Sequence, residues 1–61
     1  MVSVIEFIYK SGGIYKIKTK EAFVLDNRMN VLKIGNVNYC LDDVKKVTQY
    51  NKLGSLEIYK V

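Results

Sequence analysis

Closely spaced turn signals divide this sequence into short segments, and they restrict the possible fold more than any other feature. Glycine, asparagine and aspartate cluster at Ser11-Gly12-Gly13, Asp26-Asn27-Arg28, Gly35-Asn36 and Asn51-Lys52-Leu53-Gly54. Such residues tolerate the backbone conformations of tight turns. The segments between them are short and rich in β-branched and aromatic residues, as β-strands are. The sequence therefore predicts an all-β fold.

We expect one domain over residues 1–61, a small barrel or rolled antiparallel sheet of about five to seven short strands. At most one short helical or 3₁₀ turn, through Lys45, is expected, and Asp42-Asp43 can cap it. The expected strands are Val2–Tyr9, Ile14–Lys20, Ala22–Leu25, Met29–Ile34, Val37–Leu41, Val47–Tyr50 and Ser55–Val61.

The alternation of side chains predicts which faces of these strands are buried. Residues 2–9 carry apolar side chains at both parities, which is typical of a strand buried on both faces. Residues 14–20 alternate cleanly, so that one face holds apolar residues and the other faces solvent. The solvent face of that strand carries Lys16, Lys18 and Lys20, and the expected core face of the hairpin that follows carries Val37, Tyr39 and Leu41.

The size of the chain predicts self-association. With 61 residues, 49% of them hydrophobic, a single small core is marginally stable and cannot hide all of the apolar side chains. One cysteine and no histidine leave neither an intrachain disulfide nor a Cys/His zinc site as a staple. A two-fold dimer is the default expectation, formed by the apolar first and last strands through Ile5, Phe7, Ile8, Leu56, Ile58 and Tyr59.

Few residues are candidates for chemistry, and we expect neither an enzyme nor a bound cofactor or metal. Cys40 has no histidine to act as its base. Its parity, opposite to that of Tyr39, is compatible with the outer face of its strand, but a packed, inert thiol is the favoured interpretation. Asp42 and Asp43 are sequence neighbours, so in an extended chain they point to opposite sides and cannot share a proton. Glu6 lies in the most apolar strand, where it needs a cross-strand lysine or a place at a subunit interface.

The charge of the chain allows either a protein or a nucleic acid partner. Ten Lys+Arg against six Asp+Glu give a net charge of +4, and Arg28 is the one arginine. Specific base readout depends on arginine, so this composition disfavours a sequence-specific reader. The lysines could instead follow a phosphate backbone or only keep a strand face solvated. The candidate contact residues are Lys16, Lys18, Lys20, Lys45 and Lys46.

Residues 26–32, Asp26-Asn27-Arg28-Met29-Asn30-Val31-Leu32, resemble the first motif of the Sm and Sm-like RNA-binding family. In that motif an Asp-x-x-Met-Asn turn precedes an apolar strand. The resemblance covers about seven residues. It implies that Asp26 and Asn30 line an RNA-binding loop of a ring-shaped oligomer.

The layout as a whole also resembles small accessory proteins of low-GC Gram-positive bacteria and their phages. The features that carry this resemblance are Phe7-Ile8-Tyr9-Lys10 before a glycine turn and a late Leu-Asp-Asp-Val-Lys corner at residues 41–45. It implies a protein that binds and blocks a host or defence protein. No apolar run approaches the ~20 residues that span a bilayer, and no basic leader precedes Val2, so we expect a cytoplasmic chain with no membrane partner. We therefore expect a non-enzymatic, homo-oligomeric binding protein, with an Sm-like or nonspecific nucleic-acid-binding module as the alternative.

Overall fold

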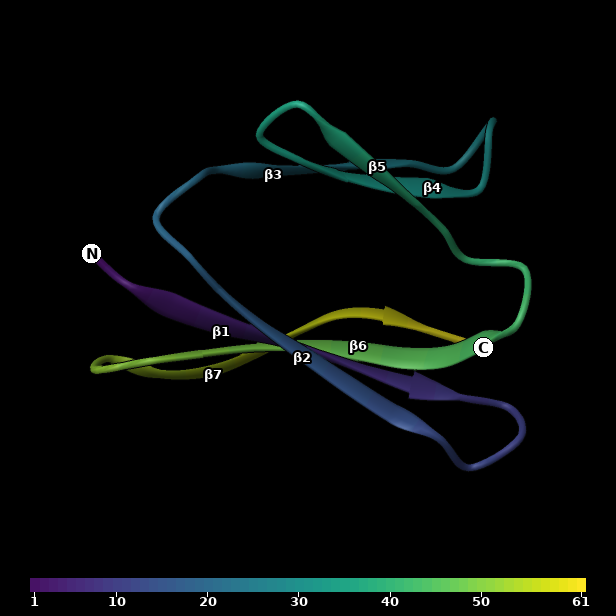
Figure 1. The fold of residues 1–61 in the computed structure, drawn as a ribbon, viewed down its shortest axis with the longest axis horizontal. Coiled ribbons are helices and arrows are strands. Elements are labelled where there is room, and N and C mark those ends of the chain that lie inside the picture. The colour runs from purple at the N-terminus through teal and green to yellow at the C-terminus, as the bar shows by residue number, and fades with distance from the viewer.

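The computed structural model describes residues 1–61 and contains seven strands and no helix (Figure 1). This confirms the all-β prediction. The strands are β1 (Ser3–Tyr9), β2 (Ile14–Thr19), β3 (Phe23–Asp26), β4 (Val31–Ile34), β5 (Val37–Cys40), β6 (Val44–Asn51) and β7 (Gly54–Lys60).

The strands form two antiparallel sheets that lie one above the other (Figure 1). The larger sheet has the order β2-β1-β6-β7 and the smaller one the order β3-β4-β5. No strand of one sheet is hydrogen-bonded to a strand of the other, so the strands do not close into a barrel. Four strand edges therefore stay unpaired, those of β2, β7, β3 and β5.

The core lies between the two sheets. Ile5 and Phe7 enter it from β1, and both are only 1% exposed. Phe7 packs against the Tyr39 ring of β5, with ring centroids 5.2 Å apart, which ties the small sheet to the large one. The core consists of the buried side chains of Ile5, Phe7, Leu32, Ile34, Leu41, Val44 and Val47.

The prediction that β1 is buried on both faces is wrong. Val4 and Ile8 are half-buried, and Val2 is exposed. The three-stranded sheet covers one face of the four-stranded sheet, and no other element covers the opposite face. Similarly, Val37 shares the inner parity of Tyr39 but is 52% exposed, because it lies at the end of an edge strand.

The short helical turn that Asp42-Asp43 could cap does not form at residues 42–45. Leu41 and Val44 are both buried in the core, and the Val44 N–H donates to the Leu41 carbonyl at 3.0 Å. Asp42 and Asp43 form a tight turn between them. Val44 then pairs with Tyr9 of β1, so β6 begins three residues before the predicted strand start at Val47.

Two β-bulges interrupt the large sheet. Opposite the step from Ile8 to Tyr9, the register of β6 skips Lys45. Opposite the step from Val47 to Thr48, the register of β7 skips Ile58. An extra residue of this kind reverses the side-chain alternation beyond it, and this decides which residues of β6 and β7 share a face.

Candidate binding face

The uncovered side of the four-stranded sheet, called here the outer face, is the broadest surface that the fold presents. Cross-strand partners in an antiparallel sheet point to the same side, so the register defines its members. They are Ile14, Lys16 and Lys18 from β2, Val4, Glu6 and Ile8 from β1, Lys46, Thr48 and Tyr50 from β6, and Ser55, Glu57 and Lys60 from β7.

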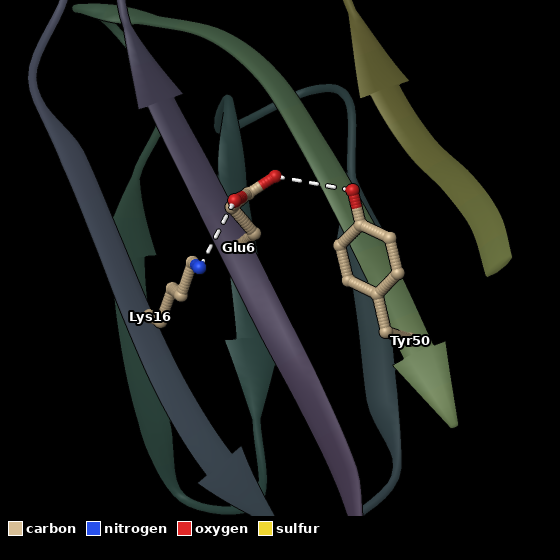
Figure 2. Close-up of polar contacts among 3 residues, drawn as sticks. All are labelled: Glu6, Lys16 and Tyr50. Carbon is tan, nitrogen blue, oxygen red and sulfur yellow. Dashed lines mark hydrogen bonds and ion pairs between the residues drawn. The ribbon is translucent and has the colours of Figure 1, made fainter. Parts of the chain in front are cut away.

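Glu6 lies at the centre of the outer face, between Lys16 and Tyr50 (Figure 2). One carboxylate oxygen lies 3.7 Å from the Lys16 ammonium. The other accepts a hydrogen bond from the Tyr50 hydroxyl at 3.2 Å. The Glu6 side chain is only 14% exposed, and the lysine partner expected from the sequence is in place. The expectation of a cross-strand pair is thus confirmed.

A second ion pair joins β6 to β7 on the outer face. The Lys46 ammonium lies 3.8 Å from the Glu57 carboxylate, with both side chains well exposed. Thr48 stands between Glu6 and Glu57 in the register and is buried, because its longer neighbours cover it. The contribution of the exposed pair to stability is small, about 0–1 kcal/mol.

The five lysines predicted as contact residues do not all lie together. Lys16, Lys18 and Lys46 belong to the outer face, and two of them are paired with glutamates. Lys20 lies just beyond the end of β2, and Lys45 is the exposed extra residue of the β6 bulge. The lysines of this face therefore do not form an uninterrupted positive track.

The six residues predicted as an oligomer interface divide into two groups. Ile5 and Phe7 are 1% exposed and belong to the core of a single chain, so they have no surface to offer a second copy. Ile8, Ile58 and Tyr59 are half-buried, and Leu56 is 54% exposed. Of the two terminal strands, β7 thus keeps the larger apolar surface.

Cys40 is exposed, so the expectation of a packed thiol is wrong. It lies on β5 at the parity opposite to Tyr39, and the outward side of the small sheet has no layer above it. Hydrogen bonds from Asn30 and Cys40, together with the charge of Lys10, lower the pKa of the neighbouring Asp42. No group of three or more His, Cys, Asp or Glu side chains is arranged to hold a metal ion.

The residues that resemble the Sm motif shape a turn between β3 and β4. The Asp26 carboxylate accepts hydrogen bonds from the backbone N–H groups of Arg28 and Met29. Asn30 adopts a positive φ of 54°, and its side-chain amide donates to Asp42 at 2.9 Å. Both polar side chains are thus engaged by the chain itself.

The largest concave feature is a cleft of about 520 Å³ between β2 and the β4–β5 hairpin. It lies where the unpaired edges of β2 and β5 leave the space between the sheets open. The residues that line it include the apolar Ile17, Val37 and Tyr39 and the charged Lys18 and Glu21.

Sequence reasoning missed Tyr50 and Glu57 as members of the outer face. Tyr50 forms a hydrogen bond with Glu6, which is 44 residues away in the sequence, and no local sequence pattern predicts such a contact. The sequence could not place Glu57 opposite Thr48, because this pairing depends on the bulge at Ile58.

No protein-family model, curated protein sequence or solved structure matches this chain. The structure contains no helix that is long and apolar enough to cross a membrane. The function is therefore inferred from the geometry of the protein's own surface.

Proposed function

We propose that this is a non-enzymatic binding protein that engages a macromolecular protein partner through the outer face of its four-stranded sheet. The observation that carries the proposal is the mixed character of that face. Lysines alternate there with glutamates and with apolar side chains, of which Ile14 and Tyr50 are 61% and 43% exposed. Exposed apolar and aromatic side chains beside charges of both signs are common at protein interfaces.

The same mixture weighs against the alternative, an Sm-like or nonspecific nucleic-acid-binding module. Glu6 and Glu57 stand between the lysines of this face, where their charges would repel a phosphate backbone. Proteins that follow phosphates neutralise them with unpaired cations. The sharpest form of the proposal is a phage-encoded inhibitor of a host or defence protein, acting in the bacterial cytoplasm, as the resemblance to small accessory proteins implies.

Affinity capture with two matched double variants tests the proposal. Ile14→Ser with Lys18→Glu alters the outer face at two exposed residues and leaves the Glu6–Lys16 pair intact. Val24→Ser with Lys33→Glu makes the same chemical changes on the exposed side of the small sheet, where the two residues are cross-strand partners. Each tagged protein is incubated with bacterial cytoplasmic extract, and the captured proteins are identified by mass spectrometry.

We expect the first variant to lose a protein that the unaltered chain and the second variant both capture. Capture that survives in the first variant would place the binding surface elsewhere. A single-stranded DNA column provides the test of the alternative. Retention that falls steeply with salt and disappears in the first variant would replace the protein partner with a nucleic acid.

A further inference from the structure

We propose that β7 pairs with the β7 strand of a second copy, antiparallel and about a two-fold axis, so that Glu57 of each copy lies opposite Lys60 of the other. The strand is the last one in its sheet, and its outward edge has no neighbour. Most of its residues are exposed. This inference goes beyond the proposed function, because it assigns a surface for a second copy and not for the partner.

The bulge at Ile58 gives the segment Leu56–Val61 a symmetric arrangement of side chains. Glu57 and Lys60 point to the outer face, opposite Thr48 and Lys46. Ile58 and Tyr59 both pack against the core, and Leu56 points inward opposite Gln49. Val61, after Lys60, returns to the inward parity. From residue 56 to 61 the order is in, out, in, in, out, in, which is the same in both directions.

This symmetry makes the proposed register possible. Residues opposite each other in an antiparallel pair must point to the same side of the sheet. In a regular strand, residues 57 and 60 point to opposite sides, and a two-fold pairing of one with the other is forbidden. Because the bulge brings both to the outer face, Glu57 can meet Lys60 of the second copy without turning a side chain through the sheet.

The backbone N–H and carbonyl groups at the free edge of β7 are placed to form hydrogen bonds in the same register. Antiparallel ladders alternate between residues that bond to one neighbour and residues that bond to the other. The Val61 N–H donates back to Lys45 of β6 at 3.0 Å, so the Lys60 N–H and carbonyl face the free edge. The direction of bonding alternates along β7 from the two-residue turn at Lys52-Leu53. The N–H and carbonyl of Glu57 therefore face the free edge as well. Glu57 and Lys60 are thus the residues able to exchange hydrogen bonds between copies.

The side-chain pairs that result are complementary in charge and in polarity. Each Glu57 faces a Lys60, each Ile58 faces a Tyr59, and each Leu56 faces a Val61 of the other copy. Opposite charges and pairs of aromatic with β-branched residues are favourable cross-strand neighbours. Leu56 and Val61 are 54% and 71% exposed in the single chain, so the pairing covers apolar surface that the fold itself leaves open.

The other free edges are poorer candidates for self-pairing. Pairing β2 with itself about Ile17 would set Lys16 opposite Lys18 of the second copy, and like charges in direct opposition are destabilising. The edge strands β3 and β5 have four residues each, which is little for a stable ladder. β7 is the longest of the edge strands, and it pairs with itself in a register that places opposite charges together.

A charge-swap series followed by sedimentation equilibrium tests the register. We expect the unaltered protein to reach twice its 7.0 kDa chain mass as its concentration is raised. Lys60→Glu and Glu57→Lys each place like charges opposite each other at two symmetric positions, and each should weaken the dimer roughly tenfold or more. The double variant restores opposite charges and should dimerise within a few-fold of the unaltered chain.

Lys46 keeps an oppositely charged neighbour in the double variant, because it is the register partner of Lys60 and forms an ion pair with Glu57. In the double variant it faces a glutamate at position 60. Lys52→Glu changes the net charge as Lys60→Glu does but lies in the β6–β7 turn, and it should leave dimerisation unchanged. Far-UV circular dichroism confirms folding of each variant.

A chain that stays monomeric at every concentration would overturn the proposal and make the bulge a device that blocks edge pairing. A dimer that tolerates both single reversals, or one that the double variant does not restore, would also overturn it. The mass of the dimer is measured without a partner, and capture of a partner is tested separately by the changes at Ile14 and Lys18, so failure of one proposal is distinguishable from failure of the other.

Discussion

Asp42 joins two turns that are 12 residues apart in the sequence, because it accepts a hydrogen bond from the Asn30 amide. Asn30 is also the one non-glycine residue with a positive φ, a conformation that asparagine tolerates better than most residues. This contact holds the β3–β4 turn against the turn that leads into β6. It is the main reason that the pKa of Asp42 is lowered.

The lowered pKa predicts a pH-dependent contribution of Asp42 to stability. A carboxyl group whose pKa is lower in the folded state stabilises the fold above its unfolded pKa, and this contribution is lost as pH falls through the folded pKa. Asn30→Gly removes the amide and keeps the positive φ accessible. We expect the pKa of Asp42, followed by NMR of the carboxyl carbon, to rise toward its ordinary value in this variant.

Asn27→Gly is the control for this measurement. Asn27 lies in the same β3–β4 turn and is exposed, and it does not contact Asp42 in the structure. The pKa of Asp42 should keep its lowered value in this variant. If both variants shifted the pKa equally, the cause would be loosening of the turn and not the Asn30 hydrogen bond.

At the residue scale, sequence reasoning reached those contacts that strand alternation fixes. Glu6 needed a lysine partner, and Lys16 of the next strand supplies it. Tyr50, which shares the same carboxylate, could not be foreseen, since its position depends on how β6 aligns with β1. The exposure of Cys40 depends likewise on which side of the small sheet remains uncovered.

At the scale of elements, the β1–β2 hairpin turn relies on one of its two glycines. Gly12 has a φ of +98°, and a Cβ there would meet open space. Gly13 is not in the positive-φ region, and a Cβ there would make ordinary contacts at 3.8 and 3.9 Å. Gly12 and Gly13 therefore differ in their backbone conformation, and a Cβ atom could be accommodated at both positions.

We expect Gly12→Ala to lower the free energy of unfolding by about 1–2 kcal/mol, because the left-handed region penalises a side chain. Gly13→Ala should change it by less than about 0.5 kcal/mol or raise it slightly, because alanine restricts the unfolded chain. Urea denaturation of both variants measures the difference. Equal effects would mean that the turn can adopt another conformation.

The strands themselves were largely predictable, and the bulges were not. Apolar alternation and glycine turns are local signals, and they placed every strand within a few residues of its observed bounds. The extra residues Lys45 and Ile58 are defined only by the partner strand, so alternation within a single segment cannot reveal them. The start of β6 was not predictable either. The strand begins at Val44 and not at Val47, because Val44 pairs with Tyr9 of β1.

At the scale of the whole molecule, the sequence indicated a small β-rich core but not the number of sheets. Closure into a barrel would require β2 and β7 each to bond to an edge of the small sheet. Such pairing depends on long-range geometry that turn spacing does not encode. The separation leaves a core of seven buried apolar residues, and each one supplies a large part of the stability.

We expect Leu32→Ala to remove about 2–5 kcal/mol, because Leu32 is 0% exposed. A chain of this length has a total stability of only about 3–9 kcal/mol, so much of the protein should be unfolded at low urea concentration. Val24→Ala, at a position 62% exposed, should cost less than about 1 kcal/mol. Circular dichroism during urea titration measures both, and a small loss for Leu32→Ala would place the stability outside this core.

The order of strands in the large sheet also determines how the chain bears tension. β1 and β7 both run antiparallel to β6, which lies between them, so they point the same way and the two ends of the chain lie at opposite ends of the sheet (Figure 1). A force that pulls these ends apart acts along the strands and across their hydrogen bonds. The bonds of both ladders then share the load and must break together, instead of opening one after another. A force applied between the two ends should therefore be resisted even though the core is small, since resistance to force depends on the rate of unfolding and not on equilibrium stability.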